Sequence, residues 1–436
     1  MEFKQYPSYK PSGVEWLGDV PEHWQIVRTK DIFNHRKEEA LEDDEIVTAF
    51  RDGQVTLRKN RRTDGFTNSI KEHGYQHINS GDLVIHEMDA FAGAIGVSDS
   101  SGKSTPVYSV CYAKNENINH HFYSHFFRTM AKTGFINSLA KGIRVRSTEF
   151  RWNESRNVYL VEPPKSDQQK IVAFLDTETT RIDNLIAKQE KLIELLEEQR
   201  KSIISHAVTK GLNPNAPMKD SGVEWLGKVP NDWNLSRLDA VSKIVRGNSA
   251  FSKMDLLESG KYVALQYGKT YKVNEINESF GSYVNQEFFK KSQITEFGDI
   301  ILISTSETLE DLGHSCFYAR HDVGLIGGEQ FLLKPKNQNF GKYIYYATKA
   351  FSSYLQRYAT GLKVFRFNLD DLKKIYIPDI SLVEQQKIAE FLDKETARID
   401  ISVLKQKSLI EKLKEYRASI ISHAVTGKID VREFGA

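Results

Sequence analysis

The sequence predicts an α+β (mixed α/β) fold: two globular domains separated by two long helices that form an antiparallel coiled coil, in a pseudo-twofold tandem repeat. Three observations predict it. SGVEWLGDVPEHW at 12–24 returns as SGVEWLGKVPNDW at 221–233, with ten of thirteen residues identical. The glycine-free segment DQQKIVAFLDTETTRID at 167–183 returns 217 residues later as EQQKIAEFLDKETARID. The interiors between these copies have diverged almost completely, while the copies themselves have not.

Length and composition agree with a repeated, soluble architecture. A chain of 436 residues is too long for one ordinary core and favours two or three domains. Two cysteines, Cys111 and Cys316, are too few for a disulfide framework and suit a reducing compartment. The first residues lack a signal-peptide pattern, and the longest apolar runs are far too short to span a membrane. We therefore expect a cytoplasmic protein with no membrane partner.

The repeat predicts four segments in chain order. These are a first globular domain, a first long helix, a second globular domain and a second long helix, with boundaries at 1–164, 165–210, 211–380 and 381–436. The two interiors mix apolar strand-like runs with helical ones. Strands are expected in DLVIHEM, DIILIST and QFLLKP, and helices in HFYSHFFRTMAK and KYIYYATKAFSSYLQRYAT.

Each long helix has start signals and a long uninterrupted body. Ser166 with Gln169, and Ser381 with Glu384, have the spacing of a capping box just after prolines. Neither Gly nor Pro follows until after the two ISHAVT segments, so each helix should run about 40 residues, or about 60 Å.

An apolar stripe on each helix predicts the coiled-coil seam, because its residues recur at spacings of three and four. The predicted seam residues are Leu185, Gln189, Leu192, Leu196, Ile203, Gln406, Leu409, Leu413, Tyr416 and Ile420. A neighbouring stripe widens the apolar face and consists of Ile182, Ile186, Ile193, Ile399, Val403 and Ile410. The equivalent residues Gln189 and Gln406 either fix the register or occupy a partly exposed edge, and the second interpretation is favoured.

The connector between the halves favours antiparallel pairing. TKGLNPNAP contains Gly211, which suits a helix C-cap, and two prolines that prevent the helix from continuing. Nine or ten extended residues reach roughly 33 Å, which is too short for the return of about 60 Å that parallel pairing needs, unless the second domain itself bridges the gap. Trp16, Leu17 and Trp24, with their copies Trp225, Leu226 and Trp233, either seat each domain on a helix end or belong simply to its core.

Basic loops in the interiors are the candidate DNA-binding elements, because Arg and Lys contact phosphates and Arg also contacts guanine edges. They lie in RKNRR at 58–62, in KGIRVRSTEFRW at 141–152 and in GLKVFRFN at 361–368, with Arg246 and Lys269 elsewhere in the second half. A solvated charged loop is the alternative for each. The candidate residues are Arg58, Lys59, Arg61, Arg62, Lys141, Arg144, Arg146, Arg151, Arg246, Lys269, Lys363 and Arg366.

The sequence contains no complete catalytic or metal-binding motif. GKS at Gly102–Ser104 lacks the upstream glycine that a phosphate-binding loop needs. The only Pro-Pro lies in EPPK, which does not fit an amino-methyltransferase motif. His120, His121 and His125 lack the partners of a metal site. We therefore expect no catalytic residue, no bound metal and no cofactor in this chain.

The order of paired phrases and paired helices resembles the specificity subunit of type I restriction–modification systems, over essentially the whole chain. The resemblance implies that each interior is a target recognition domain reading half of a bipartite, asymmetric site in double-stranded DNA. It implies that the helices set the spacer and dock two methyltransferase (modification) subunits. S-adenosylmethionine would be bound by those subunits, and ATP and Mg by restriction/translocase subunits where present.

Two other classes of function remain open from the sequence. A self-contained DNA methyltransferase or nuclease would act alone, but its motifs are missing. A protein-only coiled-coil scaffold would have no use for two divergent interiors.

Overall fold

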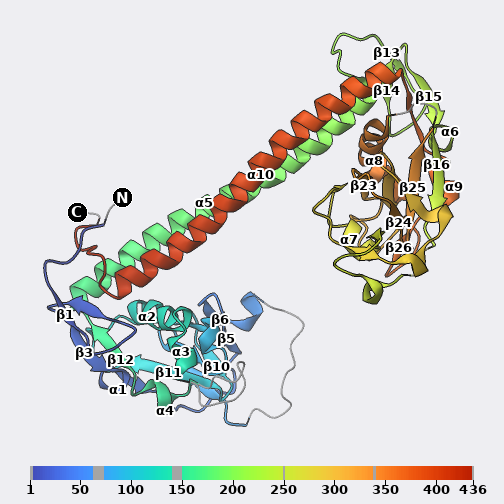
Figure 1. The fold of residues 1–436 in the computed structure, drawn as a ribbon. Coiled ribbons are helices and arrows are strands. Elements are labelled where there is room, and N and C mark those ends of the chain that lie inside the picture. The colour runs from blue at the N-terminus through green and yellow to red at the C-terminus, as the bar shows by residue number, and fades with distance from the viewer. Residues whose placement is uncertain (1–2, 62–72, 140–149, 249–250, 337–339, 435–436) are drawn as a thin grey trace. The chain divides into compact units, whose positions relative to one another are not determined.

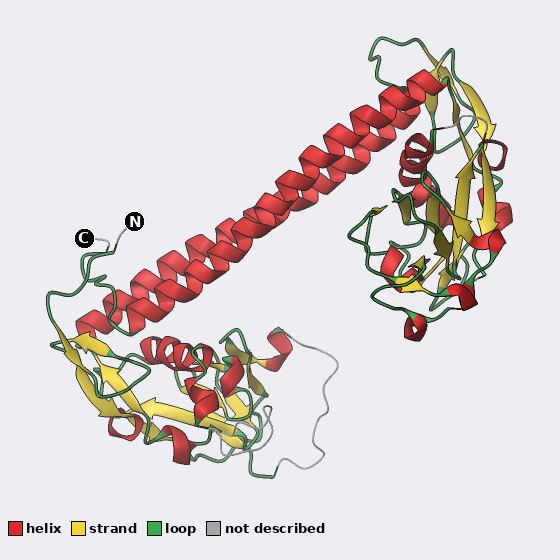
Figure 2. Cartoon of the chain, in the orientation of Figure 1, coloured by secondary structure: helices red, strands yellow, loops and turns green. Residues whose placement is uncertain are grey.

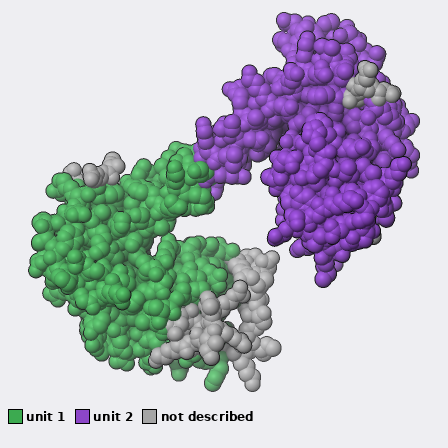
Figure 3. Space-filling view, in the orientation of Figure 1, with its two compact units in different colours: residues 1–189, 408–436 green, residues 190–407 purple. Residues whose placement is uncertain are grey.

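The computed structural model describes residues 3–61, 73–139, 150–248, 251–336 and 340–434. Contacts divide the chain into two compact units, coloured separately in Figure 3. Unit 1 comprises 1–189 with 408–436, and unit 2 comprises 190–407. Each unit therefore combines one globular domain with part of each long helix.

The globular part of unit 1 is built on an antiparallel four-stranded sheet in the order β4-β11-β8-β9, accompanied by two-stranded sheets. Helix α2 packs against strands β8 and β9 of this sheet (Figure 2). The strands are β1 (Tyr9–Pro11), β2 (Asp19–Pro21), β3 (Gln25–Arg28), β4 (Phe33–His35), β5 (Val47–Ala49), β6 (Val55–Leu57), β7 (Gln76–Ile78), β8 (Leu83–His86), β9 (Ile95–Val97), β10 (Gly102–Ser104), β11 (Tyr108–Ala113) and β12 (Tyr159–Glu162). The helices are α1 (Thr29–Ile32), α2 (His120–Lys132), α3 (Phe135–Ser138) and α4 (Trp152–Ser155).

The globular part of unit 2 has a larger five-stranded sheet, in the order β16-β25-β21-β23-β18, and a second sheet in the order β19-β17-β24-β20. Helix α8 packs on strands β21, β23 and β25 of the first sheet. The strands are β13 (Met218–Asp220), β14 (Lys228–Pro230), β15 (Asn234–Arg237), β16 (Ser242–Arg246), β17 (Tyr262–Leu265), β18 (Glu275–Ile276), β19 (Tyr283–Val284), β20 (Ile294–Thr295), β21 (Ile300–Ile303), β22 (Thr305–Ser306), β23 (Ser315–Tyr318), β24 (Gly324–Ile326), β25 (Gln330–Pro335), β26 (Phe365–Arg366) and β27 (Tyr376–Asp379). The helices are α6 (Leu238–Val241), α7 (Tyr267–Thr270), α8 (Gly341–Leu355) and α9 (Leu369–Leu372).

The expected strands and helices of the interiors are confirmed. DLVIHEM contains β8, DIILIST contains β21, and QFLLKP is β25. The two expected helices are α2 and α8. Strand β3, directly after the first repeated phrase, pairs with β12, and β15 pairs with β27 in the same way. Each interior is therefore enclosed by a strand pair that brings its two ends together.

The long helices α5 (Lys165–Lys210) and α10 (Leu382–Val425) pack against each other and run antiparallel within each unit (Figure 1). In unit 1, Asp183 of α5 accepts from Arg417 of α10 at 2.9 and 3.1 Å. In unit 2, Arg200 of α5 pairs with Asp400 of α10. The predicted antiparallel coiled coil is confirmed. Helix α5 ends at Lys210 and is followed by Gly211, which has a φ of 74°.

These two ion pairs are repeat equivalents of each other. Asp183 corresponds to Asp400, and Arg200 corresponds to Arg417, at the same offset of 217 residues. The pairing of the two helices is thus the same in unit 1 and in unit 2, with the roles of the helices exchanged. This internal equivalence is the one that a pseudo-twofold repeat requires.

The most buried stripe between the helices is the neighbouring stripe of the sequence prediction. Of its six residues, Ile182, Ile399, Val403 and Ile410 are at most 6% exposed, whereas Ile186 and Ile193 are partly exposed. The predicted seam residues Leu185, Gln189, Leu196, Ile203, Gln406 and Leu413 are partly exposed, and Ile420 is buried. Leu192, Leu409 and Tyr416 are 38%, 41% and 37% exposed. The helix contact is therefore centred about one position away from the predicted seam, towards the β-branched residues.

Each globular core continues onto the ends of the long helices. In unit 1, buried residues of the domain cluster with Ile171 and Phe174 of α5 and with Val425 of α10. In unit 2, the corresponding cluster includes Val208 of α5 and Ile388 of α10. The domains and the helix ends share one apolar core per unit, so neither can shift without opening it.

The repeated phrase holds this junction through its last tryptophan. Trp24 Nε1 donates to Asp167 Oδ2 at 3.3 Å, and Trp233 Nε1 donates to Glu384 Oε1 at 3.1 Å. Asp167 and Glu384 are equivalent positions in the first turns of α5 and α10. Both tryptophans are almost fully buried, so the two interpretations, core residue and domain seat, hold together.

The predicted capping boxes are wrong in detail. Helix α5 already begins at Lys165, so Ser166 lies inside its first turn rather than at its N-cap. In α10, Ser381 Oγ accepts from the Glu384 amide at 3.3 Å, but the Glu384 carboxylate bonds the indole of Trp233 instead of closing the box. A tertiary partner has replaced the local one, because the carboxylate gains a buried donor there.

The burial pattern predicts that two similar truncations lower the free energy of unfolding by different amounts. Ile182→Ala should lower the free energy of unfolding by about 2–5 kcal/mol, because it opens a cavity between the helices. Leu192→Ala should cost about 1 kcal/mol or less, because much of its side chain stays in water. Urea unfolding followed by circular dichroism measures both variants. Equal losses would contradict the centring of the helix contact on the isoleucine stripe.

Candidate nucleic-acid interface

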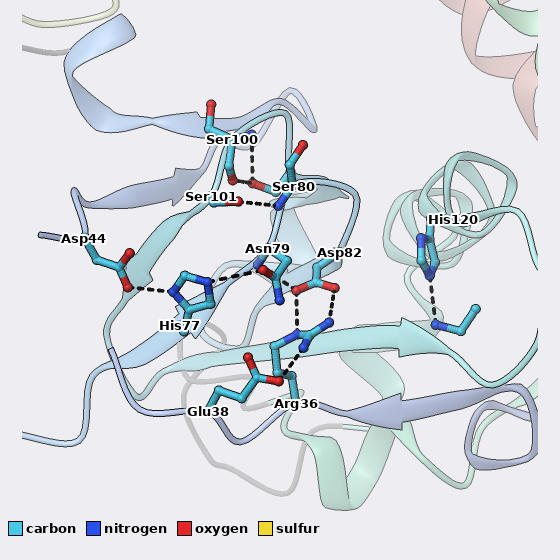
Figure 4. Close-up of polar contacts among 12 residues, drawn as sticks. Arg36, Glu38, Asp44, His77, Asn79, Ser80, Asp82, Ser100, Ser101 and His120 are labelled. Carbon is cyan, nitrogen blue, oxygen red and sulfur yellow. Dashed lines mark hydrogen bonds and ion pairs between the residues drawn. The ribbon is translucent and has the colours of Figure 1, made fainter. Parts of the chain in front are cut away.

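A buried carboxylate organises the start of a central strand in each unit. In unit 1, Asp82 accepts from Arg36 Nε at 2.8 Å and from Arg36 Nη2 at 2.9 Å, while Arg36 Nη1 reaches Glu38 at 2.6 Å (Figure 4). Asp82 also accepts from the Asn79 amide at 2.8 Å, which closes the turn before β8. Because each group has a partner, this network stabilises the turn and offers no free nucleophile or base.

In unit 2 an equivalent buried aspartate closes the turn, and it is paired with a different cation. Asp299 accepts from the Glu296 amide at 2.9 Å and pairs with Lys334 at 2.9 Å. Burial raises the pKa of the Asp299 carboxyl, and the hydrogen bonds from Glu296 and Lys334 oppose that shift. Asp82 lies in SGDLVI at 80–85 and Asp299 lies in FGDIIL at 297–302, two similar segments separated by the same offset of 217 residues as the helix repeats. The repeat therefore preserves a scaffold contact in both interiors.

The polar groups around this turn in unit 1 are also mutually satisfied. His77 Nδ1 lies 2.6 Å from Asp44 Oδ2, and its Nε2 lies 3.3 Å from Asn79 Oδ1 (Figure 4). The rejected phosphate-loop segment Gly102–Ser104 is strand β10, paired with β7, so it does not open a helix as a phosphate loop would.

The predicted histidine group does not form a metal site. His120 Nε2 accepts from the Ala113 amide at 3.0 Å (Figure 4), and burial lowers the pKa of His125 to about 3. Across the described part of the chain, no group of three or more His, Cys, Asp or Glu side chains could hold a metal ion. The helices described there also include none long and apolar enough to cross a membrane.

Of the basic residues predicted at 58–62, the structure describes Arg58, Lys59 and Arg61, which directly follow β6. Arg58 and Lys59 are in the 3₁₀ helix Arg58–Asn60, which follows β6. Arg58 Nε donates to Thr48 at 3.3 Å, and Lys59 pairs with Glu45. Arg61 pairs with Asp52 at 2.7 Å, and its guanidinium lies over the ring of Phe50 in the β5–β6 turn. These cations are already engaged by neighbours, so DNA contact would have to share or displace those pairs.

Several other candidates of the first domain cannot be placed. Arg62, Lys141, Arg144 and Arg146 fall outside the described residues. Arg151 is the N-cap residue of α4 and lies 3.9 Å from Glu87, with most of its side chain exposed.

The candidate DNA-binding residues of the second domain are exposed and lie on short elements or at the end of a strand. Arg246 ends β16, and Lys269 lies on α7. Lys363 and Arg366 belong to a hairpin closed by two backbone hydrogen bonds between Thr360 and Arg366. This hairpin presents its charges to solvent, as a DNA-contacting loop would need to.

Sequence reasoning missed a second group of cations, on the helices that face the long helix pair. Arg128 lies on α2 and Lys349 lies on α8. Burial lowers the pKa of both side chains, and the charges of Arg417 and Arg200 respectively add to these shifts. The only signal in the sequence was the repeated arginine before SIISH. Arg128 and Lys349 lie in the diverged interiors, which cannot be aligned with each other by sequence.

The comparisons with known proteins agree with this architecture. The type I restriction modification DNA specificity domain matches the chain twice, over residues 21–197 and 230–412. The putative type I restriction enzyme MjaX specificity subunit of Methanocaldococcus jannaschii is 25% identical, over 95% of this chain and 96% of its own length. The type I restriction enzyme EcoKI specificity subunit of Escherichia coli is 24% identical over 47% of this chain and 44% of its own.

Solved structures show the same fold at low sequence identity. A chain from a study of complex assembly and conformational transition in the type I R-M system has a TM-score of 0.68 at 15% identity, covering 93% of this chain and 98% of that chain. The HsdS subunit from Thermoanaerobacter tengcongensis has a TM-score of 0.55 at 16% identity, covering 94% and 98%. The chain belongs to the family of type I restriction–modification DNA specificity proteins and is a specificity subunit, the non-catalytic subunit of such a system.

Proposed function

We propose that the two globular domains are target recognition domains, each reading one half of a bipartite, asymmetric site in double-stranded DNA. The long helices would set the distance between the halves and would dock two methyltransferase subunits. In this proposal S-adenosylmethionine is bound by those subunits, and ATP and Mg by restriction/translocase subunits where the system has them.

The main support for the proposal is that the same set of contacts, which we call the frame, surrounds two unlike interiors. The frame repeats in detail: an indole bonds an acidic residue at each helix start, and Asp82 and Asp299 close equivalent turns. The interiors differ in size and topology, with a four-stranded central sheet in unit 1 and a five-stranded one in unit 2. Divergence inside a preserved frame is what two different DNA half-sites would require.

The internal symmetry supports an asymmetric target. Equivalent helix contacts in the two units exchange the roles of α5 and α10. Domains related in this way would meet the duplex in opposite orientations, as the halves of dimeric DNA readers do. Because the interiors are unlike, the two half-sites would be unlike as well.

The proposed DNA contacts come mainly from exposed cations on loops and short elements. Arg246, Lys269, Lys363 and Arg366 are exposed in unit 2, and Arg151 is exposed in unit 1. Positive side chains on such loops can contact phosphates and base edges without disturbing the core. With a net charge of only +2, the chain would depend on its partner subunits for much of the phosphate contact.

The helix pair also has the apolar surface that a docked subunit would cover. In unit 2, Leu195, Ile401 and Leu404 are 49%, 54% and 65% exposed. The Arg200–Asp400 pair places Leu195 and Leu404 at nearly the same level along the antiparallel helices. Exposed apolar residues at one level of a helix pair favour a protein contact, since water would otherwise cover them at a cost.

Exchange of one interior tests whether each globular domain reads one half-site. Asn234 and Asp379 are register partners in β15 and β27, so a segment cut there leaves the frame intact. Replacing 235–378 with the corresponding interior of another specificity subunit should change one half of the methylated motif and leave the other. Sequencing of methylated genomic DNA measures this. The matched exchange cuts at Gln25 and Glu162, also register partners, and should change the opposite half. Changes in both halves from a single exchange would contradict the proposal.

Charge placed on the exposed apolar surface tests docking. The double variant Leu195→Glu, Leu404→Glu should weaken assembly with the methyltransferase subunit by about tenfold or more, as loss of an interface hot spot does. Its melting temperature should stay close to wild type, because both side chains are largely exposed. Lys201→Glu, at an exposed position of the same helix, is the control. Sedimentation of the mixed subunits measures assembly, and equal effects from variant and control would contradict the proposed docking face.

A further inference from the structure

The hairpin between Thr360 and Arg366 of unit 2 carries an apolar side chain that is almost fully exposed to solvent. Leu362, near its tip, is 98% exposed, the highest value among the large hydrophobic residues that the structure describes. Burial of a leucine side chain is favourable, so this exposure leaves free energy unused in the folded chain. A partner that covers Leu362 would recover that free energy.

The backbone holds the tip of this hairpin in a fixed shape. The Thr360 amide donates to the Arg366 carbonyl, and the Arg366 amide donates to the Thr360 carbonyl, both at 2.9 Å. Gly361 has a φ of 113°, and an added Cβ there would lie 2.0 Å from the carbonyl oxygen of Val364. Because this turn requires glycine, the sequence itself fixes Leu362 at an exposed position.

The base of the hairpin is anchored in the core of unit 2. Strand β26 pairs with β22, with Arg366 opposite Thr305. The Phe367 amide donates to the Ser304 carbonyl at 3.2 Å. The buried ring of Phe367 stacks on that of Phe331, with centroids 6.0 Å apart. The hairpin is therefore a supported projection, as an element that inserts into a partner needs to be.

Two cations accompany the exposed leucine. Lys363 follows it directly, and Arg366 closes the hairpin. Both side chains are exposed, and neither forms an ion pair with any residue that the structure describes. An apolar side chain beside unpaired positive charges fits a partner that is anionic outside and apolar inside. Stacked base pairs between two phosphate backbones have this composition.

The first interior contains the same short sequence pattern. GIRV at 142–145 and GLKV at 361–364 each consist of glycine, an aliphatic residue, a basic residue and valine. Each precedes the short helix, α4 or α9, that leads to β12 or β27. Residues 142–145 lie outside the described part of the chain, so only their sequence is compared. The interiors have otherwise diverged almost completely, and a pattern kept in both indicates a role that does not depend on the DNA sequence.

We propose that Leu362 is a wedge that inserts between two stacked base pairs of the DNA bound by unit 2, while Lys363 and Arg366 contact the flanking phosphates. This inference rests on the proposed DNA-reading function and deepens it. Leucine is one of the side chains that unstack a base step and kink the duplex in other DNA-binding proteins. A kinked duplex contacts more of the protein surface, and these contacts offset the cost of unstacking.

A protein partner fits these features less well. Leucine is under-represented among the residues that dominate protein interfaces, and those residues cluster in well-packed pockets rather than on single projecting tips. The exposed apolar residues proposed to dock the methyltransferase, Leu195 and Leu404, lie on the long helices instead. Loss of assembly in a hairpin variant is the result that would favour a protein contact.

Bending of the target duplex tests the wedge in the full-length chain assembled with its methyltransferase subunits. Energy transfer between dyes at the two ends of a duplex that carries the methylated motif measures the bend. Leu362→Ala should reduce the bend by about 20° or more, the lower limit for kinks made by inserted side chains. Leu362→Met should keep the bend, because methionine also acts as a wedge. Both variants should have the melting temperature of wild type, since so exposed a side chain has little packing to lose.

Met254 provides a matched control. It also lies in unit 2, is 95% exposed and directly follows a lysine, Lys253. Met254→Ala should leave the bend at the wild-type value. Any bending that comes from extrusion of the methylated base by the methyltransferase is present in every variant, so the comparison isolates the contribution of the hairpin.

The outcomes of this experiment are distinguishable. An equal bend in wild type and Leu362→Ala would overturn the wedge and leave the proposed function standing. An equal loss of bending in Leu362→Ala and Met254→Ala would overturn the wedge as well. Loss of methyltransferase assembly in Leu362→Ala would assign the hairpin to a protein contact, which also overturns it. Absence of binding to the motif by the wild-type complex would overturn both the wedge and the proposed function.

Discussion

The antiparallel contact between α5 and α10 is the constraint on which the rest of the structure depends. Its register is set by two equivalent ion pairs, Asp183 with Arg417 and Arg200 with Asp400, and by a buried stripe of β-branched residues beside them. Exposed ion pairs contribute little stability on their own, so the isoleucines provide the energy and the charges specify the alignment. Each globular core then extends onto the helix ends, which makes the orientation of a domain on its helices a property of one continuous core.

A preserved frame around a variable interior connects this architecture to recognition of DNA. The frame consists of contacts that occur twice: indole to acid at the helix start, aspartate to amide at the turn before the central strand, and arginine to aspartate between the helices. The interiors share few of their other contacts and differ in sheet size. Under the proposed function, a change of interior would change the DNA target, while the unchanged frame would preserve assembly.

The sequence was most informative where the repeat was most exact. The extents of the helices followed from the repeated segments, and the C-cap at Gly211 and the antiparallel pairing followed from the connector between the halves, because periodicity and breaker residues act locally. The capping box failed because Trp233 competes for Glu384 from far along the chain. The centre of the helix contact was displaced because several apolar residues compete for one face. Arg128 and Lys349 were missed because they lie in the diverged interiors, where one copy of the repeat does not predict the other.

Helix length offers the most direct test of whether the frame determines the spacing of the two half-sites. Insertion of one helical turn at equivalent positions of α5 and α10 lengthens the pair by about 5.4 Å while preserving its symmetry. Sequencing of methylated DNA should then show both half-sites unchanged and the gap between them longer by about one or two base pairs, given a rise of about 3.4 Å each. An unchanged gap, or altered half-sites with the original gap, would contradict the assignment of the helix pair as the spacer.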